Sequence, residues 1–399
     1  MANRVLDRLA AVELSESVAE RLALQPGTVH LIRAWPRGDD RLILEYGGRA
    51  GARVAGQWCC DAAILEQIAK ETADAAGGKA IALVGDPPAR VLLQAGGADR
   101  RLRPLAALVR KRGARLVSHR PERRGVVRLP TSEGDTYVKV LRPAAAEAVL
   151  PRYGAMAKLA GEAFTVPEVL AYDALRGVIR LNTVAGTPLH DLLRTPGGAR
   201  AAACAGGALR ALWGAVPSRE LPRHGPTEEA EIVQRWLVVL RRYVPELTVE
   251  VADLAARVKR DLEDGPLGAY TTLHRDLHDK QVLVTESGQV AFIDLDELAC
   301  GETALDLANL VTHFELRAVQ GDCGVETAEA AAAALIDAAN PPKAVLRRLS
   351  AYVQGVRLRL ACVYALRPGR RQVAIRLIEK AAAQASRNRR RNRSLAVGP

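Results

Sequence analysis

One short stretch, residues 274–296, limits most strongly what this chain can fold into. It reads HRDLHDKQVLVTESGQVAFIDLD, which is a polar loop followed by two apolar runs, a turn-forming ESG segment between them, and a closing acidic residue. Apolar runs on either side of a glycine-containing connection predict a β-hairpin. Such a hairpin would bring Asp276, Gln281 and Asp294 together at one end of a two-stranded ribbon.

Two carboxylates and an amide at one point suit metal-assisted phosphoryl transfer. Mg²⁺ prefers oxygen ligands, and it usually takes one or two carboxylates together with substrate phosphates. A further carboxylate is needed to orient or deprotonate the attacking hydroxyl. The spacing fits the kinase catalytic loop H-R-D-x-x-x-x-N, with Gln281 standing where Asn is expected.

The whole chain has 399 residues, enough for roughly two to three domain-sized units around this hairpin. The apolar fraction of 49% and the charged fraction of 26% are those of a soluble globular protein. No run of 18 apolar residues occurs, so we expect no membrane segment. Six cysteines without a C-x-x-C pair are typical of reduced thiols, and we expect a cytoplasmic protein.

The net charge of +12 raises the question of a nucleic-acid partner. The segment RNRRRNR at 387–393 has five arginines and no acid, and without it the balance is 52 minus 45, or +7. No aromatic residue interleaves these arginines, as a base-stacking surface would require. We therefore interpret residues 387–399 as a basic flexible tail, not as an arm for RNA, a membrane or a protein partner.

The first 112 residues show no recognisable chemical constellation. Apolar spacing predicts one amphipathic helix or two short ones over 3–24. The pattern then predicts a hairpin over 29–47, a helix over 61–75, strands over 81–85 and 90–96, and a helix over 102–113. This accessory α/β region is either a cap on the catalytic unit or a separate small domain.

Residues 114–142 predict three short strands, with turns at 120–125 and 130–135. Lys139 stands in the third strand between two valines and points to the opposite face from both. A kinase contacts the α and β phosphates of ATP from such a lysine. In the helix predicted over 143–161, Glu147 is the acid expected to pair with Lys139, with Glu162 as an alternative. Pro151 is expected either to break that helix or to open its second half.

The order of predicted elements is a small sheet followed by a mostly helical unit. Two strands over 166–173 and 177–186 lead to the connector LNTVAGTPLHDLL, where the adenine-binding hinge of a kinase would lie. The segments on either side of the catalytic loop have helical patterns. We therefore expect an α+β, bilobal fold with an accessory region at 1–112, a small β-rich N-lobe at 113–187, and a helical C-lobe with the catalytic loop at 188–386.

Three segments, HRDLHDKQ, FIDLD and GETALDLANL, are similar to the aminoglycoside phosphotransferase family, the protein-kinase-like small-molecule phosphotransferases. The resemblance extends over residues 114 to about 385 and is strongest at 272–314. It implies ATP-dependent transfer of the γ-phosphoryl group to a hydroxyl, with Asp276 as the base and Gln281 and Asp294 as Mg²⁺ ligands. It further implies that Lys139 anchors the phosphates. Asp306 and His274 match residues of the family whose roles are structural.

Two positions depart from the family pattern. Gln281 replaces Asn, which moves the amide oxygen by about one bond length. Arg275 replaces a common Gly and favours a protein kinase. However, only eleven residues separate Asp294 from Asp306, which leaves little room for an activation segment.

The short span favours a small acceptor, such as an aminoglycoside, a sugar or a related metabolite. Glu297, Glu302, His313 and Glu315 are candidates to contact a polyhydroxylated or cationic acceptor. The alternatives are a kinase that acts on a peptide or protein in a natural-product pathway, and a nucleotide-binding scaffold without catalysis.

Overall fold

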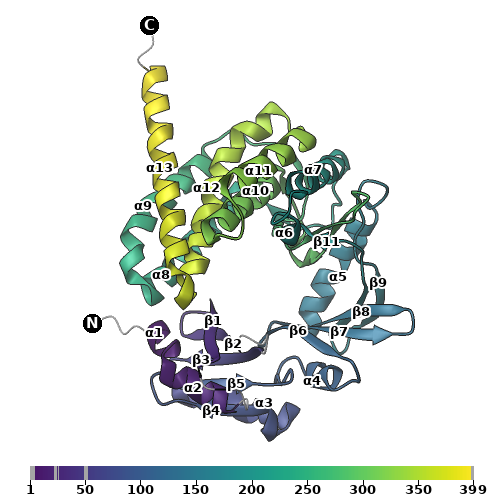
Figure 1. The fold of residues 1–399 in the computed structure, drawn as a ribbon, viewed down its shortest axis with the longest axis vertical. Coiled ribbons are helices and arrows are strands. Elements are labelled where there is room, and N and C mark those ends of the chain that lie inside the picture. Colours follow the sequence, from purple (N-terminus) through teal and green to yellow (C-terminus); the bar gives the residue numbers. More distant parts are fainter. Residues whose placement is uncertain (1–4, 22–24, 26, 49–52, 397–399) are drawn as a thin grey trace.

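The computed structural model describes residues 5–21, 25, 27–48 and 53–396. The chain builds an N-terminal unit, then a small lobe dominated by strands, then a large lobe dominated by helices (Figure 1).

The N-terminal unit is a five-stranded antiparallel sheet with helices packed against it. Its elements are α1 (Val5–Leu9), α2 (Val12–Arg21), β1 (Val29–Pro36), β2 (Arg41–Gly48), β3 (Arg53–Cys59), α3 (Ala62–Ala76), the 3-10 helix η1 (Gly78–Ala80), β4 (Ile81–Val84) and β5 (Val91–Gln94), and the strand order is β1-β2-β3-β5-β4. All but η1 and β3 were predicted. Strand β3 is buried along nearly its whole length and therefore lacks the alternation that reveals a half-buried strand.

The small lobe is a second five-stranded antiparallel sheet, in the order β6-β7-β8-β10-β9. Its elements are α4 (Pro104–Val109), β6 (Arg115–Arg120), β7 (Arg124–Thr131), β8 (Gly134–Leu141), α5 (Pro143–Ala157), β9 (Val169–Asp173) and β10 (Val178–Asn182). Strand β8 lies in the centre, where Lys139 faces Val126 of β7 and Ile179 of β10. Helix α5 continues through Pro151, contrary to our expectation, because its apolar face packs against the core and outweighs one missing hydrogen bond.

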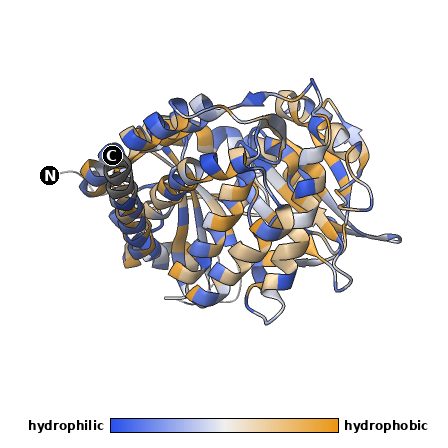
Figure 2. Ribbon diagram, turned by 90° about the horizontal axis from the view of Figure 1, so that it is seen from above, coloured by the Kyte–Doolittle hydropathy of each residue, from blue (hydrophilic) through white to orange (hydrophobic). Residues whose placement is uncertain are grey.

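The large lobe surrounds the catalytic segment with helices. Its elements are β11 (Thr187–Pro188), α6 (Leu189–Leu192), α7 (Gly198–Gly214), β12 (Arg223–His224), α8 (Pro226–Tyr243), η2 (Pro245–Leu247), α9 (Thr248–Glu263), β13 (Tyr270–Leu273), β14 (Val282–Val284), β15 (Val290–Phe292), η3 (Leu295–Glu297), β16 (Ala299–Glu302), α10 (Ala304–Gln320), α11 (Val325–Ala339), α12 (Lys343–Ala365), η4 (Pro368–Arg370) and α13 (Arg371–Ala396). Apolar and polar residues alternate around these helices (Figure 2), as in helices that bury one face. Helices α7 and α11 approach closely at Gly206, where a Cβ would clash with the Leu335 carbonyl oxygen.

The N-terminal unit and the large lobe share one hydrophobic core. A single cluster of buried side chains includes Leu9 and Tyr46 of the N-terminal unit together with Leu240, Val251 and Val356 of the large lobe. Figure 1 shows α1 and β1 next to the lower ends of α8 and α13. The N-terminal unit is therefore packed onto the large lobe as a cap.

The N-terminal unit also contacts the small lobe, through ion pairs and a contact between an arginine and an aromatic ring. The Arg120 guanidinium lies 5.1 Å from the centroid of the Trp35 ring. Glu122 of the β6–β7 turn is buried and pairs with Arg37 at 3.0 Å and with Arg100 at 2.7 Å. The N-terminal unit thus connects both lobes.

Helix α13 extends to Ala396 and includes the whole arginine-rich stretch, residues 387–393, which we had expected to belong to a flexible tail. Arginine is a good helix former, so a helix already nucleated by its packed first turns can continue into this stretch. Within the part of the chain that the structure describes, no helix is both long and apolar enough to cross a bilayer.

Candidate active site

The predicted hairpin is formed by β14 and β15, with β11 adding a third strand. Val282 pairs with Phe292, and the backbone N–H of Ile293 donates to the carbonyl oxygen of Gln281 at 3.0 Å. Gln281 and Asp294 therefore lie at the same end of the ribbon, as the sequence predicted, and the loop from His274 leads directly into that end.

Asp306 at the start of α10 holds the catalytic loop in place. Its fully buried carboxylate accepts hydrogen bonds from the backbone N–H groups of His274 at 2.7 Å and Arg275 at 2.8 Å. Burial raises the pKa of Asp306 to about 6. The His274 ring is bonded through Nε2 to the carbonyl oxygen of Ile293 at 2.9 Å, so this residue braces the loop against the hairpin.

Two residues of the site have left-handed backbone conformations, Arg275 with φ of 70° and Asp294 with φ of 61°. Such angles are costly for residues with a Cβ and occur at sites where the surroundings determine them. The guanidinium of Arg275 pairs with Glu297 at 2.5 Å. The backbone carbonyl oxygen of Arg275 accepts a hydrogen bond from Asn309 Nδ2 at 2.8 Å. These contacts hold the unusual loop geometry.

Lys139 reaches the end of the hairpin from the small lobe. Its Nζ lies 2.9 Å from Asp294 Oδ1, 2.6 Å from Asp296 Oδ1 and 3.0 Å from the Tyr153 hydroxyl. Burial favours the neutral amine, but Tyr153 and the two carboxylates outweigh burial and raise the pKa of Lys139. Arg124 also pairs with Asp294, at 3.0 Å, and with Asp296, at 3.2 Å. Although burial opposes ionisation, Lys139 and Arg124 hold the pKa of Asp294 well below its usual range.

The expected pair between Lys139 and Glu147 is not formed. Glu147 is exposed on α5, and among the described residues the acids bonded to Lys139 are Asp294 and Asp296. Tyr153, six residues after Glu147, projects about 240° further around the helix and faces the site instead. Neither Tyr153 nor Asp296 was predicted from the sequence. The only signal for Asp296 was its position two residues after Asp294.

Asp276 lies between two cavities of different character. A cavity of about 350 Å³, which we name the arginine cavity, has six guanidiniums around it and four carboxylates, one of which is Asp276. Its charged lining consists of Arg37, Arg120, Arg123, Arg124, Arg142, Arg152, Asp276, Asp294, Asp296 and Glu297. A cavity with this density of arginines is suited to a polyphosphate.

The second cavity, of about 630 Å³, is bounded by one side of α8, and we name it the α8 cavity. Its lining residues are Pro36, Gly38, Asp39, Arg123, Glu229, Ile232, Arg235, Trp236, Val238, Val239, Arg275, Asp276, Glu297 and Arg359. Arg359 Nη1 lies 3.6 Å from Asp276 Oδ1. Burial opposes ionisation of Asp276, but Arg359 and nearby imidazoles outweigh it and lower the pKa of the carboxyl.

Gln281 has the chemistry of a metal ligand. Its side chain is buried, and its amide oxygen has no hydrogen-bond partner. A buried amide oxygen next to an ionised carboxylate, Asp294, is a donor set that suits Mg²⁺. Within the described ranges no three His, Cys, Asp or Glu side chains cluster as a metal site by themselves.

Three of the four residues predicted to contact an acceptor lie outside both cavities. Glu302 is buried and pairs with Arg348 at 3.0 Å, and Glu315 pairs with Arg357 at 2.7 Å. His313 is buried and bonded to the Asn309 carbonyl oxygen. Glu297 alone lines both cavities. The sequence pattern could not distinguish Glu297 from the other three residues. It does not show which part of the chain packs against each of these side chains.

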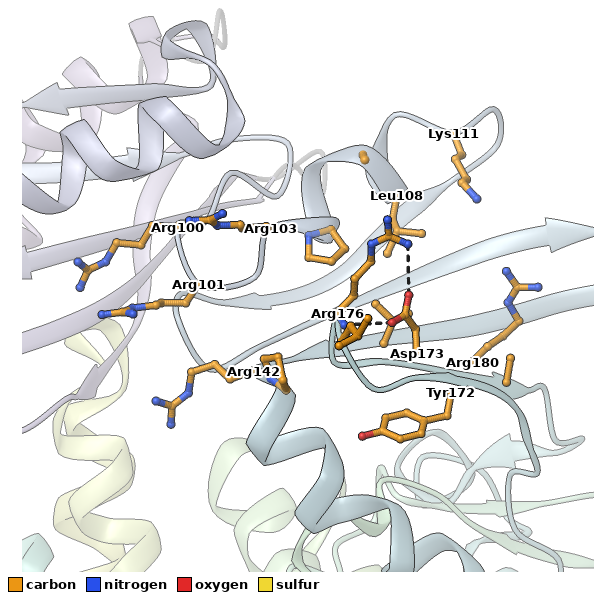
Figure 3. A pocket seen from close by; sticks show the side chains of 16 residues that line it. Arg100, Arg101, Arg103, Leu108, Lys111, Arg142, Tyr172, Asp173, Arg176 and Arg180 are labelled. Atoms are coloured by element: carbon orange, nitrogen blue, oxygen red, sulfur yellow. Dashed lines mark hydrogen bonds and ion pairs between the residues drawn. The ribbon is translucent and has the colours of Figure 1, made fainter.

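A larger basic cavity, of about 940 Å³, lies between α4 and the edge of the small-lobe sheet. Figure 3 shows Arg103, Lys111, Arg176 and Arg180 around it, with Arg176 bonded to Asp173. None of the predicted site residues lines this cavity.

One comparison with known proteins identifies a protein family. The model of the phosphotransferase enzyme family (APH) matches residues 113–361, which is more than half of the chain. Among curated proteins, no sequence matches this chain. The matched span begins just before β6, the first strand of the small-lobe sheet, and leaves the N-terminal unit outside.

Several solved structures resemble this chain at low sequence identity. A choline/ethanolamine kinase family protein from Mesorhizobium loti is 20% identical, with 70% of this chain and 92% of that chain covered and a TM-score of 0.48. The aminoglycoside phosphotransferase APH(3'')-Id from Streptomyces rimosus, in complex with ADP and streptomycin, is 19% identical, with coverages of 58% and 88% and a TM-score of 0.43. A thermostable mutant of APH(4)-Ia with ADP and hygromycin B is 18% identical, with coverages of 68% and 92% and a TM-score of 0.49.

Proposed function

Since the chain belongs to the phosphotransferase enzyme family and has its bilobal protein-kinase-like fold, we propose that it transfers the γ-phosphoryl group of ATP to a hydroxyl of a small molecule. The observation that supports this most strongly is the position of Asp276. Its carboxylate borders both the arginine cavity, suited to a polyphosphate, and the α8 cavity, which is open to an acceptor.

The nucleotide would bind between the lobes. Its phosphates would lie in the arginine cavity near Lys139 and Arg124, and its base would lie at the connector between β10 and α6. Lys139 and Arg124 are now paired with Asp294 and Asp296. A triphosphate would compete for these two cations and so release the carboxylates.

Gln281 and Asp294 would hold Mg²⁺, because one offers a buried amide oxygen without a partner and the other an ionised carboxylate. When bound, the ion neutralises the charge that develops on the phosphate oxygens. Glu147, which we had expected at the nucleotide, is exposed, and we do not assign it a role.

The chain's own residues would then act as follows. Asp276 accepts the proton of the acceptor hydroxyl as this oxygen attacks the γ-phosphorus, while the bond from the γ-phosphorus to the β–γ bridging oxygen breaks and ADP leaves. Arg359 keeps the Asp276 carboxylate ionised and oriented. Asp306 and His274 fix the loop, so that Asp276 is already placed before the acceptor binds.

The test is the variant Asp276→Asn, assayed for phosphoryl transfer by mass spectrometry of the acceptor and for ATP binding by calorimetry. We expect transfer to fall by about 10²-fold or more, because the amide cannot accept the proton, while the ATP affinity changes little. Asp294→Ala should instead abolish turnover that depends on Mg²⁺. Wild-type turnover by Asp276→Asn on a verified acceptor would show that the mechanism is wrong, and phosphate found only on polypeptides would exclude a small acceptor.

A further inference from the structure

The charges of the residues that line the α8 cavity indicate which class of acceptor it can bind. Eight charged residues line it, four of them carboxylates and four of them guanidiniums. Next to it lies the arginine cavity, where guanidiniums outnumber carboxylates by six to four. A polycationic acceptor would need an excess of carboxylates, and this surface does not provide one.

Two residues that line the α8 cavity, Glu229 and Arg359, each have one buried polar atom without a hydrogen bond. Glu229 of α8 is 2% exposed, and while its Oε2 is bonded to His224 at 2.9 Å, its Oε1 has no hydrogen-bond partner. Arg359 of α12 is bonded through Nη2 to Asn309 at 2.6 Å, but its Nε is buried without a hydrogen-bond partner. These two atoms, Oε1 and Nε, lie 4.0 Å apart, too far for a hydrogen bond between them.

The two atoms need a group that can both donate and accept. A hydroxyl can donate its hydrogen to Glu229 Oε1 and accept from Arg359 Nε, whereas an ammonium has three donors and no acceptor. An ammonium would also face the Arg359 guanidinium. Burial opposes ionisation of Glu229, but His224 and Arg359 outweigh it and lower the pKa of the carboxyl, so the acceptor atom is present at neutral pH.

The guanidinium of Arg359 connects this pair to the base. Its Nη1 is 3.6 Å from Asp276 and its Nε is 4.0 Å from Glu229, so a hydroxyl held by Glu229 and Arg359 lies beside the one that Asp276 would deprotonate. Trp236 of α8 adds an apolar ring face to the same cavity, and Asp39 of the β1–β2 turn adds a carboxylate. Adjacent hydroxyls and an apolar ring face are features of a sugar-like polyol.

We propose that the acceptor is an uncharged polyol with neighbouring hydroxyls, one of which is bound between Glu229 Oε1 and Arg359 Nε while the next one is phosphorylated. This inference rests on the proposed function, because it takes Asp276 as the base. It also assigns the turn of the N-terminal unit to the acceptor site, since Pro36, Gly38 and Asp39 form one wall of the cavity.

The first experiment measures ADP release by the full chain with Mg²⁺ and ATP against matched acceptors. The panel pairs glucose, galactose and mannose with their 2-amino analogues, and it adds myo-inositol, kanamycin and neomycin. We expect release with at least one neutral polyol, and a kcat/KM about tenfold lower or more for its amino analogue, because the ammonium leaves Arg359 Nε unpaired. Turnover of only the polycations would overturn the inference and leave the proposed function intact.

The second experiment compares Glu229→Gln with the control Glu315→Gln, which removes the same charge from an acid paired with Arg357 outside the α8 cavity. In Glu229→Gln the amide oxygen would accept from His224, and its NH₂ would face Arg359, so the hydroxyl loses its acceptor. We expect the KM for the polyol to rise about tenfold, with the KM for ATP unchanged within about twofold.

The outcomes separate the two proposals. An equal acceptor KM in both variants would overturn the role of Glu229. If no polyol in the panel stimulates ADP release although the chain binds ATP, the polyol site is wrong. If the chain neither binds ATP nor shows turnover that depends on Asp276 with any acceptor, the proposed function itself fails.

Discussion

At the scale of single residues, the catalytic loop depends on buried carboxylates. Asp306 bonds two backbone N–H groups of the loop, and Asp279 anchors its far side. The Asp279 carboxylate receives Arg317 Nε at 2.6 Å and Nη2 at 2.9 Å, together with a bond to His190 Nδ1 at 2.9 Å. A carboxylate with three charge-assisted or ring donors is fixed in place, and the loop is fixed with it.

This anchor predicts the response to acid. Burial opposes ionisation of Asp279, but Arg317 and His190 outweigh it and hold its pKa far below the unfolded value of about 3.9. A depressed folded pKa contributes stability that is present above about pH 4 and is lost as the pH falls below that value. We expect Asp279→Asn to lower the free energy of unfolding at pH 7 by about 3 kcal/mol, since Arg317 loses its buried partner.

The measurement is urea unfolding of both proteins from pH 7 down to pH 3. The difference in the free energy of unfolding between wild type and Asp279→Asn should shrink as the pH falls below about 4. At that pH the carboxyl of the unfolded wild-type chain becomes protonated, so the stability that the ionised carboxylate gives to the folded state is lost. A difference that is independent of pH would contradict the assignment of an ionised Asp279.

At the scale of elements, α5 decides which side chain supports Lys139. The sequence predicted Glu147 as the partner of Lys139, but the helix turns this residue to solvent and turns Tyr153 towards the site. The sequence also predicted a break at Pro151, and the helix continues through it. Rotation about a helix axis is set by which face packs against the core, and that choice depends on the neighbours.

The two residues of α5 give a matched test. We expect Glu147→Gln to leave the KM for ATP unchanged within about twofold, because Glu147 makes no bond to Lys139. Tyr153→Phe removes a hydrogen bond worth about 1 kcal/mol from the lysine and should raise the KM for ATP roughly fivefold. Steady-state kinetics with varied ATP would distinguish them, and a larger effect of Glu147→Gln would favour the pair expected from the sequence.

At the scale of the whole molecule, the N-terminal unit shares a hydrophobic core with the large lobe. Helices α1 and α2 and the first sheet share one apolar cluster with α8, α9, α12 and α13, and the Trp58 ring packs edge-on against Tyr243 of α8 at 6.5 Å. The structure therefore favours the cap over the separate domain, the two options that the sequence left open.

This shared core predicts that the chain unfolds as one unit. Calorimetry of the full chain should show a single transition, and a fragment of residues 113–399 should be insoluble or bind a hydrophobic dye, because it exposes the apolar faces that α1, α2 and the first sheet cover. A soluble, monomeric fragment with the stability of the full chain would contradict this view. The control is a fragment that ends at residue 386, which keeps the whole cluster.

The sequence by itself determined the family, the order of the lobes and the position of Lys139, Asp276, Gln281 and Asp294. These follow from local information, since strand alternation, a hairpin turn and a fixed loop spacing act over a few residues. Only the tertiary structure decided that Arg124, Tyr153 and Asp296 surround Lys139, that the N-terminal unit borders the acceptor cavity, and that Glu229 approaches Arg359. These contacts join residues separated by 14 to more than 150 positions, and the packing of faces that creates them is not encoded in any local pattern.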